Sequence, residues 1–235
     1  NIRDLAVSSC VCGRKHEVPI REVEIAPGLL ASLDRKLAAL GTWKRILLVA
    51  DENTWPVAGA TLEKVLAGSW TLGKAILPGD CKADEAAVAA VLGAAAAPDL
   101  VLAAGAGTLT DVVRHVAAGK WGIPFVSVPT APSMDGYASA VSAMTFGGFK
   151  VTRPARPPLA IYADLAVLAA APRRLVAAGA ADLLGKHTAL TDWLLAREMT
   201  DEYHCPRIAA LVQEAADACG NDCAALRAGK EDAIA

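Results

Sequence analysis

Gly105, Gly107 and Thr108 lie between an apolar run at residues 100–104, which predicts a buried strand, and a helical pattern that stops at Gly119. Glycines at such a turn let the backbone approach a phosphate, and the N–H groups of the following helix favour an anion. The segment lacks the third glycine of a dinucleotide-binding fingerprint and the Gly-Lys-Ser/Thr of a P-loop. It therefore predicts either a phosphate site or only a tight turn.

A polar loop, Thr130-Ala131-Pro132-Ser133-Met134-Asp135-Gly136, follows a second buried strand predicted at residues 123–128. Its hydroxyls and carboxylate suit a polyol or a nicotinamide, although such turn residues need no function. Asp51 ends another apolar strand, predicted at residues 45–50. A carboxylate there can bind a ribose diol and repel the extra phosphate of NADP, or it can only cap a turn.

Asp182 follows Gly179-Ala180-Ala181 and is predicted to lie in the first turn of a helix, with Lys186 one turn further on. An aspartate at a helix start usually caps the helix, and a lysine four residues later offers it an ion pair. These residues alone favour capping over metal binding. A short basic segment could bind a substrate phosphate or be an ordinary solvated surface. It contains Lys150, Arg153 and Arg156.

The six cysteines predict reduced thiols, because a disulfide framework is typical of short secreted chains. They are Cys10, Cys12, Cys81, Cys205, Cys219 and Cys223. Cys10 and Cys12 with His16, like Cys219 with Cys223, have spacings that could bind metal, but neither set is a pair of CxxC motifs. Cys205 follows His204 without a ligand spacing. A structural zinc ion is therefore not favoured.

Strand and helix patterns alternate as far as Ala163, which predicts a mainly parallel, Rossmann-like α/β sheet covered by helices. From Ala180 onward only helical periodicity remains. We therefore predict an α/β domain at residues 1–165 and an all-helical domain at residues 166–235. The weak pattern of residues 220–235 suggests that the helical domain is truncated.

A net charge of −2 gives no electrostatic reason to expect nucleic acid or an anionic membrane surface as a partner. The longest apolar region, residues 86–107, is broken by Pro98-Asp99 and falls short of a membrane span. No signal peptide is visible at the start of the sequence. A cytoplasmic protein without membrane insertion is expected.

Four segments together resemble the bacterial branch of the sn-glycerol-1-phosphate dehydrogenase family. They are residues 105–111, 122–139, 149–165 and 177–186, and SVPTAPSMDGYAS at 127–139 is the most specific part. More broadly, they resemble iron-containing alcohol dehydrogenases, glycerol dehydrogenases and dehydroquinate synthases. The resemblance implies an NAD(P)-dependent, metal-dependent oxidoreductase that reversibly reduces dihydroxyacetone phosphate to sn-glycerol 1-phosphate, and a homo-oligomer, dimeric or larger.

The resemblance also implies residue roles. Pyrophosphate would be held by Gly105, Ala106, Gly107, Thr108 and Leu109, and the dinucleotide contacted by Thr130, Ala131, Pro132, Ser133 and Ser139. Asp135 would contact substrate, with Lys150 a candidate for its phosphate. Asp182 would be both a substrate contact and a ligand of one divalent metal, zinc or else iron or nickel. That metal would act as a Lewis acid on the substrate carbonyl.

The sequence departs from this family at the metal site. The family uses an aspartate and two histidines, and both histidines are expected beyond residue 235, while His187 falls where relatives commonly carry a tyrosine. One carboxylate cannot hold a catalytic zinc, so a truncated or partly ordered enzyme is favoured. The alternatives are a polyol dehydrogenase acting on unphosphorylated glycerol and a non-catalytic nucleotide-binding module. Asp51 predicts a preference for NADH over NADPH.

Overall fold

The computed structural model describes residues 5–96 and 98–234, and its centre is a six-stranded sheet in the order β1-β8-β5-β4-β2-β3. The strands are β1 (Glu22–Ala26), β2 (Arg45–Asp51), β3 (Thr71–Leu77), β4 (Leu100–Gly105), β5 (Phe125–Pro129) and β8 (Ala160–Asp164). Every neighbouring pair is parallel. The predicted parallel, Rossmann-like fold is confirmed.

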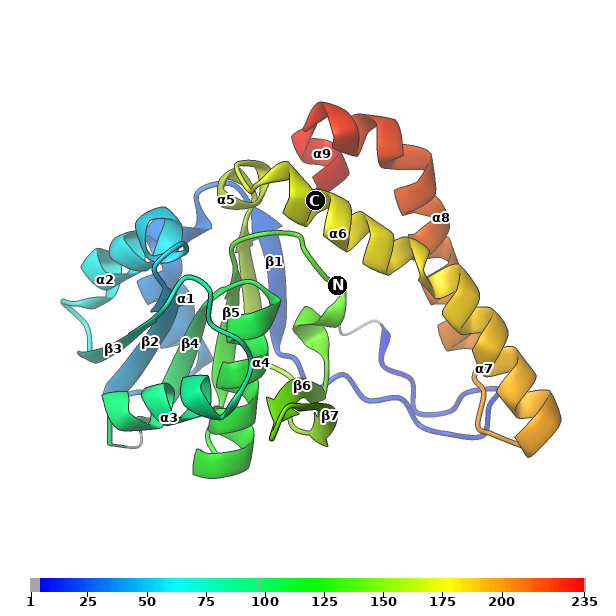
Figure 1. Ribbon diagram of the computed structural model, residues 1–235, viewed down its shortest axis with the longest axis horizontal. Helices are drawn as coiled ribbons and strands as arrows, with labels where there is room; N and C mark the ends of the chain where they lie inside the picture. The colour runs from blue at the N-terminus through cyan, green and yellow to red at the C-terminus, as the bar shows by residue number, and fades with distance from the viewer. Residues whose placement is uncertain (1–4, 97, 235) are drawn as a thin grey trace.

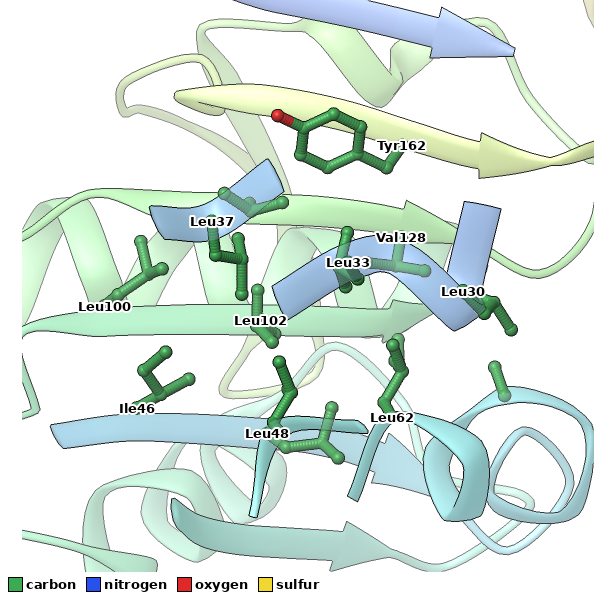
Figure 2. Close-up of a cluster of buried hydrophobic side chains, with 14 of the residues drawn as sticks. Leu30, Leu33, Leu37, Ile46, Leu48, Leu62, Leu100, Leu102, Val128 and Tyr162 are labelled. Carbon is green, nitrogen blue, oxygen red and sulfur yellow. The ribbon is translucent and has the colours of Figure 1, made fainter. Parts of the chain in front are cut away.

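Helices cover both faces of the sheet, as a parallel sheet requires (Figure 1). One face carries α1 (Leu33–Leu40) and α2 (Ala60–Leu66), and the other carries α3 (Glu85–Ala94) and α4 (Gly107–Val116). All residues of β4 are buried, because its alternate side chains enter the two cores. Leu100 and Leu102 lie in the first core, shown in Figure 2, and Val101 lies in the second.

Short helical turns and one hairpin complete the α/β part. The turns are η2 (Leu29–Ser32), η3 (Trp55–Gly59), η4 (Ala117–Trp121) and η5 (Gly136–Ala138). The hairpin pairs β6 (Val141–Phe146) with β7 (Phe149–Pro154) in antiparallel fashion. Gly147 and Gly148 have φ angles of 57° and 83°, which a two-residue hairpin turn demands and glycine adopts most easily. This hairpin was not predicted from the sequence, where strands and helices were expected to alternate up to Ala163.

After β8, the described residues form only helices, as the sequence predicts. They are α5 (Leu165–Ala169), α6 (Arg173–Leu184), α7 (Lys186–Thr200), α8 (Pro206–Ala228) and α9 (Glu231–Ile234). Figure 1 shows α8 returning along α6 and α7, to one side of the sheet. No side chain of α6 or α7 is buried. Within the described ranges, no helix has both the length and the apolar character needed to cross a membrane.

Helix α6 corrects one prediction, because it continues through Gly179 and ends at Leu184. Asp182 therefore lies in the last turn of a helix, and its predicted place in a first turn is wrong. The physical reason is packing. A Cβ atom on Gly179 would lie 1.9 Å from the carbonyl oxygen of Pro132, so glycine is required for α6 to touch the polar loop. The glycine marks a close approach rather than a helix boundary.

This contact predicts opposite effects for two glycine-to-alanine changes. Gly93→Ala, in α3 with nothing within 4 Å of the added methyl group, should stabilise the chain by about 0.5–1 kcal/mol. Gly179→Ala should instead lower the free energy of unfolding by about 1–3 kcal/mol, since backbone atoms must move apart. Urea unfolding followed by circular dichroism measures both. Equal gains for the two variants would contradict the packing role of Gly179.

Candidate active site

The candidate site lies at the carboxyl ends of β2, β4 and β5. The helix after β2 packs on one face of the sheet and the helix after β4 packs on the other, although β2 and β4 are neighbours. A crevice at such a reversal is where ligands bind in open parallel sheets. Asp51 and Gly105, the last residues of the two strands, lie at this reversal.

The turn from β4 into α4 is very tight. A Cβ atom on Gly105 would lie 2.2 Å from Cδ1 and 2.7 Å from Cβ of Leu109, so only glycine fits there. Ala106 occupies the N-cap position of α4, and no side chain caps its first N–H groups. Thr108, in the first turn, is exposed. A helix start of this kind favours an anion such as a phosphate.

The polar loop folds over this helix start. The sulfur atom of Met134 would lie 3.0 Å from a Cβ atom placed on Gly107, so the loop covers the glycine closely. The hydroxyl of Tyr137 donates a 2.6 Å hydrogen bond to the carbonyl oxygen of Ala131. Burial raises the pKa of Tyr137 to about 12, so this donor keeps its proton at neutral pH. Thr130 is buried and Ser133 is half-buried.

Arg114 holds the far end of the loop, and its role was not predicted from the sequence. Its guanidinium, 1% exposed, donates to the carbonyl oxygens of Gly136, Tyr137 and Val141 at 2.8, 3.0 and 3.0 Å. It also pairs with Asp111 at 2.7 Å. Burial raises the pKa of Asp111, although Arg114 opposes that shift. The sequence offered one sign of this role, because Arg114 is a charged residue among the valines of α4.

Asp135, Asp182 and Lys186 meet where α6 reaches the polar loop. The backbone N–H of Asp135 donates to Oδ2 of Asp182 at 3.0 Å. The ammonium of Lys186 forms its ion pair with the carboxylate of Asp135, and not with that of Asp182 as predicted. The hydrogen bond to Asp135 raises the pKa of Lys186, which keeps the ammonium charged. Two exposed carboxylates and one cation can therefore face a small polar ligand.

Asp51 adopts the capping arrangement that the sequence left open. Its Oδ1 accepts the backbone N–H groups of Asn53 at 2.9 Å and Thr54 at 2.7 Å. The hydroxyl of Thr54 accepts the N–H of Asp51 in return, at 2.9 Å. These bonds hold the carboxylate at the end of β2, and its contact with ribose stays a prediction.

The other predicted site residues lie around the hairpin. The hydroxyl of Ser139 accepts the N–H of Val141 at 3.1 Å, which shapes the entry into β6. Lys150 and Arg153 project from β7, and Arg156 follows it; all three are exposed. The cation that pairs with Asp135 in the described structure is Lys186. A phosphate-binding role for Lys150 stays a prediction.

A cavity of about 550 Å³ lies beside the site, between the β1–β8 edge of the sheet and helices α6 and α8. Its lining is mostly apolar, with Ile25, Ile161 and Leu183 among its walls and Asp135 at its rim. An apolar lining does not suit a dinucleotide or a phosphate ester. The polar groups instead converge on the loop and the start of α4.

The described residues do not complete a metal site at Asp182. Its carboxylate already accepts the Asp135 N–H, and among residues 5–96 and 98–234 it belongs to no group of three or more side chains with metal-binding atoms close together. His187 is exposed and lies against Gln213 of α8, with 2.8 Å between its Nδ1 and the Gln213 amide nitrogen. A catalytic zinc takes three protein ligands, so these residues alone do not fit one.

The fold defines an α/β protein with an open parallel sheet covered by helices on both faces. The family model for iron-containing alcohol dehydrogenase matches residues 24–172, and the chain belongs to that family. The iron-containing alcohol dehydrogenase structure from Thermotoga maritima has the same fold, with a TM-score of 0.76 at 18% identity, over 94% of this chain and 64% of that one.

Two bacterial relatives are more similar in sequence. A protein of Bacillus licheniformis is 38% identical over 221 residues, which are 91% of this chain and 54% of that protein. One of Halalkalibacterium halodurans is 36% identical over 239 residues, 97% and 58% of the two chains. Both are named glycerol-1-phosphate dehydrogenase [NAD(P)+]. This chain thus spans little more than half the length of the curated relatives that it matches.

The anchoring of the loop predicts a large effect for Arg114→Met. The change leaves Asp111, whose side chain is only 16% exposed, without its cation and removes three donors from loop carbonyls, which should cost about 3–5 kcal/mol of unfolding free energy. Arg156→Met, at an exposed position, should change it by less than about 0.5 kcal/mol. Chemical denaturation measures both values. A small loss for Arg114→Met would show that the loop is held by other contacts.

Proposed function

We propose that this chain forms the cofactor-binding part and one wall of the active site of a glycerol-1-phosphate dehydrogenase. One observation carries the proposal: the loop between β5 and β6 joins the uncapped start of α4 to the Asp135–Asp182–Lys186 group. That arrangement suits a nucleotide phosphate at the start of α4 and a small phosphorylated polyol beside Asp135. The names of the relatives support this choice of substrate.

The reaction would be the reversible reduction of dihydroxyacetone phosphate. NAD(P)H gives a hydride to the carbonyl carbon, the carbonyl oxygen takes up a proton, and sn-glycerol 1-phosphate and NAD(P)+ result. The N–H groups from Gly105 to Leu109 would bind the pyrophosphate. The residues Thr130, Ala131, Pro132, Ser133 and Ser139 would contact the dinucleotide, and Asp135 the substrate.

Asp182 would provide one ligand of a divalent metal, with zinc the first choice. The two histidines that complete such a site are expected in a part of the protein beyond residue 235. In this chain, Lys186 would fix the carboxylate of Asp135, and Asp182 would fix the backbone of the same residue. Both would therefore orient the substrate-facing end of the loop.

The division into an α/β domain at residues 1–165 and a helical metal and substrate domain at 166–235 is part of this proposal. It is supported by the last strand, β8, which ends at Asp164, and by the helices that follow. The carboxylate of Asp164 caps α5 and also accepts the N–H groups of Gly28 and Leu30, so it ties the junction to the start of η2, which follows β1. The cytoplasmic location and the homo-oligomer remain predictions.

The decisive experiment uses the complete gene product together with this chain of 235 residues. The complete product should oxidise NADH with dihydroxyacetone phosphate in preference to dihydroxyacetone, and this chain alone should only bind the nucleotide. Asp182→Asn in the complete product should lower kcat/KM by about a hundredfold or more, because a positioning group is lost. Asp192→Asn, exposed on α7, is the matched control.

Three outcomes would change the proposal. Preference for the unphosphorylated ketone would favour a polyol dehydrogenase. A complete product that binds NADH but lacks metal and activity would favour a non-catalytic nucleotide-binding module. Unchanged activity of Asp182→Asn would remove Asp182 from the active site.

The preference for NADH over NADPH provides a separate test of the role of Asp51. Asp51→Asn keeps the oxygen that accepts the Asn53 and Thr54 N–H groups but removes the charge expected to repel a 2′-phosphate. The ratio of NADPH to NADH efficiency should rise about tenfold, equivalent to ~1.4 kcal/mol. Glu52→Gln, at the neighbouring exposed position, should leave the ratio unchanged. If the ratio does not move in Asp51→Asn, another residue sets the preference.

A further inference from the structure

Four side chains with metal-binding atoms gather far from Asp182: Cys10, Cys12, His16 and Cys205. Their ligand atoms all lie within 4.8 Å of one another, and Cys205 is buried. The spacing of the first three residues suggested zinc only weakly in the sequence. Cys205 was not linked to them, because it follows His16 by 189 residues.

Three of the six distances among these atoms are close to the ligand separations of a tetrahedral zinc site. Zinc–sulfur and zinc–nitrogen bonds of about 2.3 and 2.0 Å place tetrahedral ligands ~3.8 Å apart for two sulfurs and ~3.5 Å for sulfur and nitrogen. The Sγ atoms of Cys10 and Cys205 are 3.6 Å apart. Nε2 of His16 lies 3.3 Å from Sγ of Cys12 and 3.4 Å from Sγ of Cys205.

Local structure holds the first three ligands in place. The N–H of Gly13 donates to the carbonyl oxygen of Cys10 at 2.9 Å, and Gly13 has a φ of 79°, so the chain turns sharply after Cys12. Val7 and His16 then pair as an antiparallel bridge through two backbone hydrogen bonds of 3.0 and 2.9 Å. The bridge brings His16 back beside the two cysteines.

The fourth ligand comes from a helix start. Cys205 is the N-cap residue of α8, with extended backbone, and Pro206 opens the helix. The thiolate is the form of cysteine that binds metal. The site therefore joins the N-terminal segment to the junction between α7 and α8, which Figure 1 shows lying side by side.

Further contacts hold these ligand side chains from outside the cluster. The hydroxyl of Tyr203 lies 3.2 Å from Sγ of Cys12. The guanidinium of Arg14 lies over the Tyr203 ring, 3.5 Å from its centre. The indole of Trp193, on α7, donates to the carbonyl oxygen of Tyr203 at 2.6 Å. Such outer partners orient the ligands of metal sites, and here they connect them to α7.

We propose that Cys10, Cys12, His16 and Cys205 bind a structural zinc ion that fastens the N-terminal segment to the start of α8. Four protein ligands leave no open position for water or substrate, which distinguishes a structural site from a catalytic one. The proposal concerns residues apart from those of the proposed dehydrogenase site and does not depend on that function.

Metal analysis of the 235-residue chain, purified reduced and dialysed against zinc, tests the site directly. We expect about one zinc per chain, lost in Cys10→Ser and Cys205→Ser. Cys81→Ser and Cys223→Ser, which change cysteines outside the cluster, should retain it, and so should Asp182→Asn. Zinc lost in Asp182→Asn but kept in Cys205→Ser would overturn the proposal, as would a wild-type chain without zinc.

Cobalt substitution keeps the test valid if a serine variant fails to fold. The wild-type chain with Co²⁺ should show a sulfur-to-cobalt charge-transfer band and the intense visible bands of tetrahedral cobalt. His16→Cys, which still offers four ligands, should keep the metal with a stronger charge-transfer band, whereas His16→Ala should bind it more weakly. Cobalt without a sulfur band, or a Cys10–Cys205 disulfide detected in the intact mass after aerobic zinc loading, would contradict the site.

Discussion

The contact between Gly179 and Pro132 fixes the geometry on which the candidate site depends. No side chain fits between the helix and the loop, so α6 crosses the loop at backbone distance. Residues three and seven positions after Gly179 follow on the same side of the chain. Asp182 consequently reaches the N–H of Asp135, and Lys186 reaches its carboxylate. One glycine thus brings two elements from separate layers within hydrogen-bond distance.

The opposite end of the loop depends on a buried charge. The two terminal nitrogens of Arg114 donate hydrogen bonds to three carbonyl oxygens and one carboxylate, although its Nε has no partner among the described residues. Burying a paired charge is seldom more stabilising than an apolar core of the same volume. We therefore interpret Arg114 as a residue that determines where the loop lies. Hydrogen bonds from a charged guanidinium hold the loop at Arg114, and close backbone packing holds it at Gly179.

The sequence was sufficient for the sheet because each parallel strand is a short apolar run followed by a turn. It also indicated the glycine turn at Gly105 and the polar loop, since both follow such strands. It failed where a residue acts through a distant partner. Gly179 was interpreted as a helix boundary, whereas its partner is Pro132, and Lys186 pairs with Asp135 rather than with the nearer Asp182. Periodicity reports a residue's own helix or strand, but not the neighbour that tertiary packing supplies.

Metal binding at Asp182 and at Cys205 differs because of the number of ligand side chains that the fold brings to each residue. Among the described residues, Asp182 belongs to no group of three or more side chains with metal-binding atoms, whereas Cys205 is joined by three such side chains from the N-terminal segment. Few of the described side chains in the helices after β8 are buried, and α6 and α7 have none. A closed zinc site at the start of α8 would supply the fixed point that apolar packing does not. Because α8 packs along α6, that fixed point would also limit how far Asp182 can move from the loop.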